Sequence, residues 1–306
     1  MKTLSEIIQD ARPSLSPESV KTYTSILSSL HRKVFKTDTI NIKNFDDSNK
    51  ILKFLKDVKP NVRKTILSAL FVITSNADYR KDMLDDIKSY NEHESKQIKN
   101  EKQTESWVSS DDVKELFDMY KKNATAMYKK LHLTMNDMQE IQRFIILALL
   151  GGIFIPPRRS KDYVDFKISD IDRDVDNYMK GDSLVFNSYK TAKTYGRQVV
   201  QIPAELKRIL KRWIEINPTD YLLFDTNGNK ITNVILTHRL NAIFGGKKVS
   251  VNQLRHTYLS DKYQDTIKLQ KRLAKDFENM GSSTLQEHVY IKALDVWMTS
   301  EHHEDV

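Results

Sequence analysis

Apolar residues recur every three to four positions through most of the chain, a spacing that predicts a mainly helical protein. The scarcity of helix-breaking residues agrees, because 306 residues include only 8 Gly and 7 Pro. Strong strand signals are confined to residues 182–203, where SLVFNSY and RQVVQIP flank the turn-like KTAKTYG. The sequence therefore predicts a mainly α fold that contains a small β-hairpin or sheet.

Individual helices can be placed from their caps and apolar faces. Ser16, Pro17 and Glu18 have the order of an N-cap, a first-turn proline and a first-turn acid. The other predicted helices carry Ile51–Leu55, begin near Pro60, begin after Ser109 or Ser110, and occupy Met138–Leu150 and Ala204–Ile216.

The chain is long enough for two domains, each with its own core. Residues 91–105, NEHESKQIKNEKQTE, are strongly polar and lack an apolar period, which is typical of a solvated helix end or a linker. We therefore expect a helical domain at residues 1–90, a linker at 91–106 and a second domain at 107–306.

Composition excludes several kinds of chemistry. The chain has no cysteine, so thiolate nucleophiles, disulfides and thiolate metal sites are excluded. A formal net charge of +8 favours a polyanionic partner. The most apolar segment, residues 144–155, is too short to span a bilayer, so we expect a soluble intracellular protein without a membrane partner.

Arg159 is the first candidate for anion binding. It lies in PPRRSKD, where the diproline could end one helix and start the next, leaving the arginine at a helix N-terminus. We prefer it to Arg158 because Asp162 follows one turn later, with Val164 and Phe166 then facing the core. Taken alone, the two arginines have a simpler explanation as a basic pair on the surface.

Two further candidates follow along the chain. Lys190 and Lys193 lie in the hairpin turn, from which a lysine can reach DNA and donate a proton. In NQLRHTY, Leu254 and Tyr258 should face the core, which leaves Arg255 and Asn252 on one neighbouring face. Turn lysines are common, however, and an exposed arginine beside a half-buried His256 is an ordinary helix surface.

Tyr290 completes the series. Gly281 permits a helix to end and turn, and the tyrosine is then expected on a short following helix. Most of the 13 tyrosines must be structural, so Tyr290 is distinguished only by its position after the other candidates.

Together these motifs resemble the tyrosine recombinase family of DNA integrases and resolvases, and the resemblance covers essentially the whole chain. The segments PPRRSKDY, YKTAKTYG and NQLRHTY are most similar to integrases of large DNA viruses, virophages and related mobile elements. The resemblance implies a core-binding DNA-binding domain followed by a catalytic domain. It also implies catalytic roles for Arg159, Lys190 or Lys193, Arg255 and Tyr290.

In the mechanism that the resemblance implies, Tyr290 attacks a DNA phosphate and forms a 3′-phosphotyrosyl bond. The reaction requires no metal, nucleotide or other cofactor. The implied partner is double-stranded DNA, bound by a homotetramer on paired sites. Basic stretches such as HRKVFK, residues 59–64 and LKRILKRW are expected to contact its phosphates.

The chain departs from the family pattern at two positions. Asn252 stands where the family has the first histidine of a His-x-x-Arg box, and Ser282 where it has a later histidine or tryptophan. Neither side chain accepts a proton at neutral pH, although His256 and His288 lie nearby in the sequence. Two alternatives therefore stay open: a type IB topoisomerase-like enzyme and a catalytically weakened DNA-binding protein on the same fold.

Overall fold

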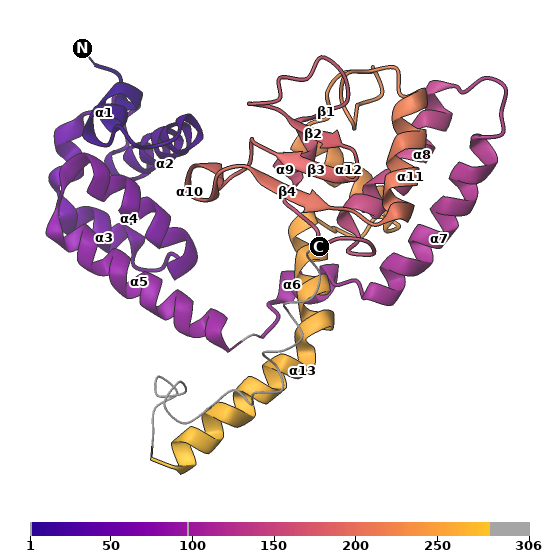
Figure 1. Ribbon diagram of the computed structural model, residues 1–306. Helices are drawn as coiled ribbons and strands as arrows, with labels where there is room; N and C mark the ends of the chain where they lie inside the picture. The colour runs from indigo at the N-terminus through magenta and orange to yellow at the C-terminus, as the bar shows by residue number, and fades with distance from the viewer. Residues whose placement is uncertain (1, 97, 282–306) are drawn as a thin grey trace. The chain divides into compact units, whose positions relative to one another are not determined.

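The computed structural model describes residues 2–96 and 98–281, and the chain divides into two compact units, Met1–Lys99 and Asn100–Val306. Both are predominantly helical, and the second contains a small sheet (Figure 1). This confirms the predicted fold class. The assignment of residues 1–90 to DNA binding and of 91–106 to a linker stays a prediction.

Unit 1 is built from helices around one apolar core. Its helical segments are α1 (Leu4–Ala11), α2 (Pro17–Phe35), the 3₁₀ helix η1 (Ile42–Asp46), α3 (Ser48–Leu55), α4 (Pro60–Thr74) and α5 (Ala77–Ser95). Ser16 caps α2 as predicted by accepting a hydrogen bond from the Ser19 amide. The core includes Leu27, Leu67 and Leu70. Val62, in the first turn of α4, is exposed.

Unit 2 begins with one helix that overlaps the polar stretch at residues 91–105, as the end of α5 in unit 1 also does. Its helices are α6 (Glu101–Ser106), α7 (Ser110–Met127), α8 (Met135–Leu150), α9 (Ser160–Val164), α10 (Ala192–Tyr195), α11 (Ala204–Ile216), α12 (Asn233–Ile243) and α13 (Val251–Asn279). Ser109 caps α7 in a reciprocal pair with Asp112, and Thr134 caps α8 in the same way with Asp137. Many of the polar residues that suggested a linker are therefore helical.

The sheet of unit 2 is larger than the predicted hairpin. Its strands are β1 (Phe166–Lys167), β2 (Asn177–Lys180), β3 (Ser183–Phe186) and β4 (Gln198–Gln201), in the order β1-β2-β3-β4. The predicted pair β3 and β4 is antiparallel, with Val185 opposite Val199. The connection between them is more than a turn, because it contains α10.

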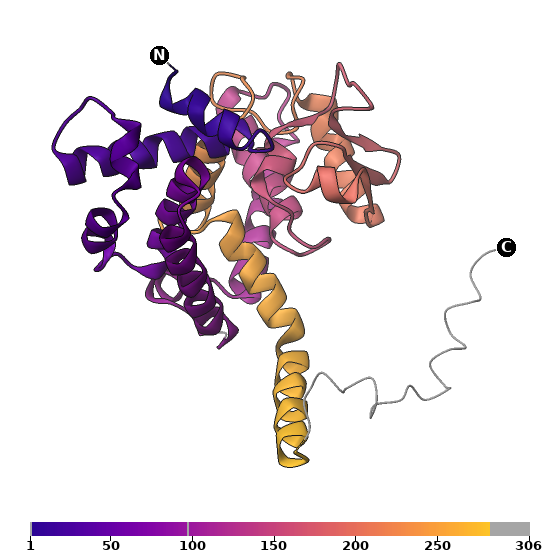
Figure 2. The ribbon, with the colours of Figure 1, turned by 90° about the vertical axis from the view of Figure 1, so that its left-hand side faces the viewer.

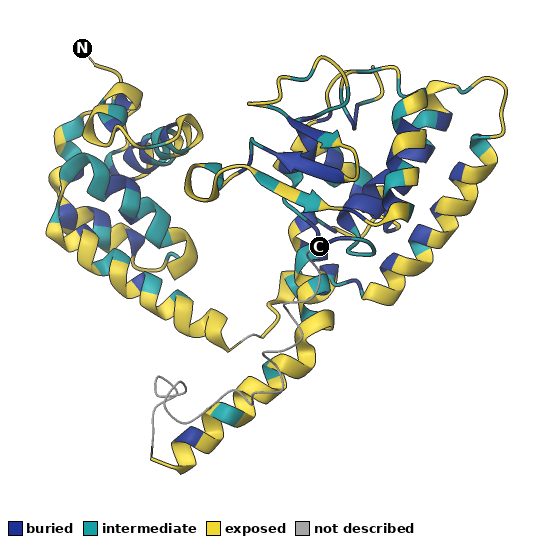
Figure 3. Cartoon of the chain, in the orientation of Figure 1, coloured by how far each residue is buried: buried dark blue, intermediate teal, exposed yellow. Residues whose placement is uncertain are grey.

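A second apolar core joins the helices and the sheet of unit 2. It includes Phe117 of α7, Ile145 of α8, Phe186 of β3, Trp213 of α11 and Leu254 of α13. The first turns of α13 belong to this core. Its later part extends beyond the rest of the unit and is largely exposed (Figures 2 and 3).

Candidate active site

A cavity of about 250 Å³ in unit 2 gathers charged side chains from distant parts of the sequence. Its lining includes Arg158, Arg159, Asp162, Tyr189, Gln198 and Arg255, and we call it the arginine pocket. These residues come from the segment entering α9, from α9 itself, from the β3–β4 connection, from β4 and from α13. Two predicted site residues, Arg159 and Arg255, are thus brought together.

Arg159 is the N-cap residue of α9, with φ −70° and ψ 153°. Its half-buried side chain makes no hydrogen bond or ion pair with the described residues. The diproline before it does not join two helices as predicted, because α8 already ends at Leu150 and residues 151–159 are irregular. Instead, this irregular segment leads to Arg159, whose own backbone is extended.

Arg158, which the sequence analysis set aside, is the arginine that pairs with Asp162. Its Nε donates to Asp162 Oδ2 at 2.8 Å, and its Nη1 donates to Gln198 Oε1 at 2.8 Å. Its guanidinium carbon lies 4.0 Å from the ring centroid of Phe186 and 5.2 Å from that of Tyr189. The expectation that linked Asp162 to Arg159 is therefore corrected: the direct ion pair belongs to Arg158. Val164 and Phe166 are buried as predicted.

The electrostatics of the pocket favour an anion. Burial raises the pKa of Asp162, while Arg158, Arg159 and Arg255 act in the opposite direction. Burial lowers the pKa of Arg255, and the like charge of Arg159 adds to this effect. Three guanidinium groups share one carboxylate, so a bound anion would offset a charge that the protein leaves uncompensated.

Arg255 is held in place by the way the start of α13 is anchored. Thr257 Oγ1 donates to the buried carbonyl of Val108 at 2.7 Å. On another face of the helix, Tyr258 contacts Gly152, where a Cβ atom would lie only 2.5 Å from the tyrosine ring. Gly152 also has φ +74°, which favours glycine. These contacts place Arg255 at the pocket.

The predicted pairing of Arg255 with Asn252 is confirmed as a shared helix face. Arg255 Nη1 lies 3.4 Å from Asn252 Oδ1, a long hydrogen bond. Asn252 is exposed, and so is His256, contrary to the half-buried position considered for that histidine. Leu254 is buried as expected, whereas Tyr258 is only half-buried.

Asn177 of β2 fixes the backbone around the pocket and was missed by sequence reasoning. Its fully buried amide nitrogen donates to the carbonyls of Asp162 and Ser188 at 3.0 and 2.8 Å. Its oxygen accepts from the amides of Asn187 and Ser188 at 2.9 and 2.8 Å. One side chain therefore ties α9 to the end of β3.

Lys190 and Lys193 lie on the β3–β4 connection, where the sequence predicted them. Both are exposed and make no hydrogen bond with the described residues. Neither lines the pocket, although Thr191 and Tyr195 of the same connection do. The lysines are therefore close to the pocket along the chain but are not part of its wall.

The remaining candidates, Ser282, His288 and Tyr290, lie outside the described residues. The chain leading to them has the predicted form, because α13 ends at Asn279 and Gly281 has φ +68°.

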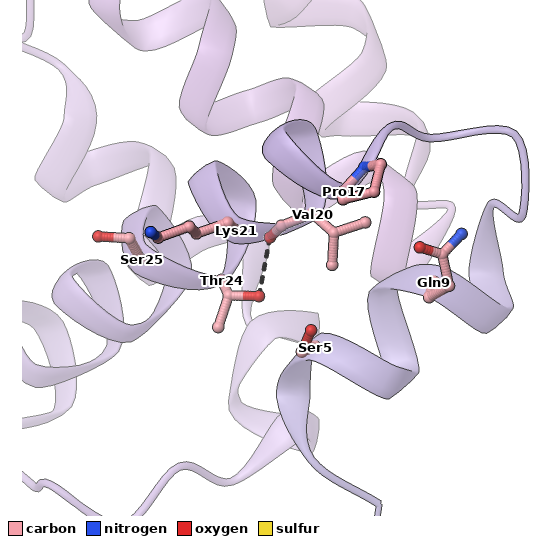
Figure 4. A pocket seen from close by; sticks show the side chains of 7 residues that line it. All are labelled: Ser5, Gln9, Pro17, Val20, Lys21, Thr24 and Ser25. Atoms are coloured by element: carbon pink, nitrogen blue, oxygen red, sulfur yellow. Dashed lines mark hydrogen bonds between the residues drawn. The ribbon is translucent and has the colours of Figure 1, made fainter. Parts of the chain in front are cut away.

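A larger pocket in unit 1 offers much less chemistry. The α1–α2 pocket of about 490 Å³ is lined by Ser5, Gln9, Pro17, Val20, Lys21, Thr24 and Ser25 (Figure 4). Lys21 is the only charged residue in the described lining, and Thr24 Oγ1 donates to the carbonyl of Val20 within the same helix. The arginine pocket is therefore the better candidate despite its smaller volume.

No metal site and no membrane span are found within residues 2–96 and 98–281. In these ranges no three His, Asp or Glu side chains are grouped so that they could hold a metal ion. None of the described helices is both long enough and apolar enough to cross a bilayer.

Comparison with known proteins gives similarity to solved structures alone. No protein-family model and no curated protein matches the sequence. A XerH site-specific recombinase bound to its palindromic difH substrate is 13% identical, with a TM-score of 0.46 over 86% of this chain and 73% of that one. Lambda integrase (residues 75–356), bound as a dimer to a COC′ core site, is 13% identical with a TM-score of 0.42, covering 97% of each chain. These values are too low to assign a function.

Proposed function

We propose that the protein is a site-specific DNA recombinase or integrase that cleaves and rejoins DNA through a 3′-phosphotyrosyl intermediate. The observation that carries this proposal is that Arg159 and Arg255 line one pocket, and that Asp162, the one carboxylate among its described lining residues, is already paired with Arg158. Such an arrangement suits a phosphodiester, which offers two non-bridging oxygens to two guanidinium groups.

In the proposed reaction the hydroxyl oxygen of Tyr290 attacks the phosphorus of the scissile phosphodiester. A P–O bond to tyrosine forms, the P–O5′ bond breaks, and the free 5′ hydroxyl later reverses the exchange on a partner strand. Arg159 and Arg255 stabilise the charge on the non-bridging oxygens in the transition state. No external energy source is required, because the phosphotyrosyl bond conserves the energy of the phosphodiester.

Two proton transfers accompany this exchange. Lys190 or Lys193 donates a proton to the leaving 5′ oxygen, and a base accepts the tyrosine proton. Asn252 and Ser282 are hydrogen-bonding groups in this scheme, because neither takes up a proton at neutral pH. Asn252 can steer Arg255, to which it is hydrogen-bonded. His256 and His288 are the nearby candidates for the base.

Leaving-group chemistry distinguishes the two lysines. Replacing the acid with alanine should slow cleavage roughly 10²- to 10⁴-fold. A substrate with sulfur in place of the bridging 5′ oxygen should restore the rate of that variant, because a thiolate leaves without protonation. We expect this rescue for Lys190→Ala or for Lys193→Ala. Rescue of neither variant would contradict the proposed acid.

We further propose that unit 1 binds double-stranded DNA and that a homotetramer forms on paired sites inside the cell, as in a virus-derived or mobile element. The net charge of +8 supports a polyanionic partner. Affinity should fall steeply as salt rises, because cations released from DNA drive phosphate binding. A stable monomer that relaxes supercoils without recombining paired sites would instead favour a topoisomerase-like enzyme.

A nicked suicide substrate tests the proposed function. Loss of the short cleaved fragment traps the enzyme on DNA, so the wild type should form a covalent adduct that Tyr290→Phe abolishes without weakening DNA binding. Tyr263→Phe is the matched control, because Tyr263 is an exposed tyrosine of α13 that does not line the arginine pocket. An adduct that persists in Tyr290→Phe would refute the assigned nucleophile. Absence of any adduct from the wild type would favour a non-catalytic DNA-binding protein.

A further inference from the structure

The Asp162 carboxylate can compete with phosphate for the guanidinium groups of the arginine pocket. The residue is only 3% exposed, and its Oδ2 accepts from Arg158. Its other oxygen, Oδ1, is buried and has no hydrogen-bond partner among the described residues. A buried carboxylate oxygen without a donor is costly, so any nearby guanidinium group that is free to move is attracted to it.

Arg158 forms the ion pair with that carboxylate, and its own side chain is held in a fixed orientation. Besides the bond to Asp162, it donates to Gln198 of β4 and lies over the Phe186 ring of β3. These contacts come from elements formed by residues far along the chain, so the orientation of Arg158 is set by the sheet. Arg159, the adjacent residue, has no such contacts among the described residues.

We propose that Arg158 is a positioning residue that engages Asp162 and thereby keeps Arg159 and Arg255 open for phosphate. This inference rests on the proposed function and assigns Arg158 no contact with the DNA. Removal of the Arg158 charge leaves Asp162 with both oxygens unpaired. Arg159 then turns to the carboxylate, and the pocket loses one of its two phosphate ligands.

The proposal makes a prediction that a merely structural role does not. Arg158→Met keeps an unbranched side chain over the Phe186 ring but removes the ion pair, and it should weaken binding of inorganic phosphate about tenfold or more. Adding Asp162→Asn removes the competing charge. The double variant Arg158→Met/Asp162→Asn should therefore recover phosphate affinity to within about threefold of the wild type.

The experiment is calorimetric titration of the full chain with inorganic phosphate for the wild type, both single variants and the double variant. Asp162→Asn alone should bind at least as tightly as the wild type. Far-ultraviolet circular dichroism checks folding, and Arg158→Gln replaces Arg158→Met if the methionine variant does not fold. The proposal is overturned if the double variant binds no better than the Arg158 variant, or if the Arg158 variant binds like the wild type.

Because these titrations use no DNA, their outcome is separate from that of the suicide substrate. Rescue of phosphate binding without any covalent adduct would retain the positioning role and reject the recombinase function. An adduct at Tyr290 without rescue of phosphate binding would retain the recombinase function and reject the positioning role of Arg158.

Discussion

Two arginines, one in each unit, show how the same side chain serves stability in one place and a proposed reaction in another. Arg63 of α4 donates Nε and Nη2 to the two oxygens of Asp86 at 2.8 and 2.7 Å. Hydrogen bonding to that carboxylate raises the pKa of Arg63. Arg159 of unit 2 is half-buried as well, yet its neighbouring carboxylate is held by Arg158.

The difference shows that partners distinguish a structural cation from a candidate ligand-binding cation. A guanidinium group that donates to both oxygens of its own carboxylate has little left to offer a ligand. One that faces a cavity without a partner retains its donors. Volume is a poorer guide, since the α1–α2 pocket is larger than the arginine pocket but has one charged lining residue.

The largest expected effect comes from replacing Arg159, the arginine that has no hydrogen bond or ion pair with the described residues. Arg159→Ala should slow adduct formation on the suicide substrate roughly 10²- to 10³-fold, because one donor to the transition-state oxygens is lost. Thermal unfolding should change little, since the side chain makes no hydrogen bond or ion pair with the described residues. Single-turnover cleavage and calorimetry measure the two quantities. If Arg159→Ala lowered stability but kept the cleavage rate, Arg159 would be a structural residue and not a catalytic one.

Replacing Arg63, the arginine paired with Asp86, should lower stability and leave the cleavage rate unchanged. Arg63→Met strands the buried Asp86 carboxylate and should lower the free energy of unfolding by about 3 kcal/mol. Urea unfolding measures this loss, and the cleavage rate per folded molecule should stay unchanged. Lys81→Met, an exposed cation on α5, is the matched control. Equal stability of the two variants would show that the Arg63–Asp86 pair is dispensable.

A smaller loss is expected where α13 contacts the loop before the pocket. Gly152→Ala combines a left-handed φ with a contact of 2.5 Å to the Tyr258 ring, and should cost roughly 2 to 3 kcal/mol. Gly245→Ala has a similar φ of +66° but no atom within 4 Å, so it isolates the backbone strain and should cost about 1 kcal/mol. Urea unfolding compares them. Equal losses would show that the close approach of Gly152 to Tyr258 does not contribute to stability, and hence does not help to position Arg255.

The smallest effect concerns pH and the start of α8. The Lys130 ammonium and the Thr134 amide and hydroxyl lower the pKa of Asp137 from its ordinary value of 3.8 to about 2. The stability gained from this carboxylate is therefore present above pH 3.8 and is lost as the pH falls from there toward 2. Thermal unfolding of the wild type and of Asp137→Asn should converge over this range. A difference that stayed constant with pH would contradict the shift.

Sequence reasoning succeeded where local signals decide structure. The cap at Ser16 and the bounds of α11 follow from residues adjacent to each helix. Strands β1 and β2 were missed because such short segments form only through pairing with distant partners. The β3–β4 pair was found because its strands are rich in Leu, Val, Phe and Ile and are separated by turn residues.

The site was predictable in its residue types but not in its pairing. Arg159 and Arg255 were identified from sequence, whereas the choice of Arg158 as the partner of Asp162 depends on Gln198 and the Phe186 ring. Asn177 gives no local signal at all, because its bonds join α9 to the end of β3. Long-range contacts of this kind are set by the folded chain.

Arginine side-chain NMR during titration with inorganic phosphate tests most directly whether Arg159 and Arg255 bind the ligand. We expect the Nε–Hε signals of Arg159 and Arg255 to shift together and saturate at the same phosphate concentration, while the signal of Arg63 stays in place. Signals of Arg159 and Arg255 that do not move, or that move no more than Arg63, would contradict the proposed phosphate site.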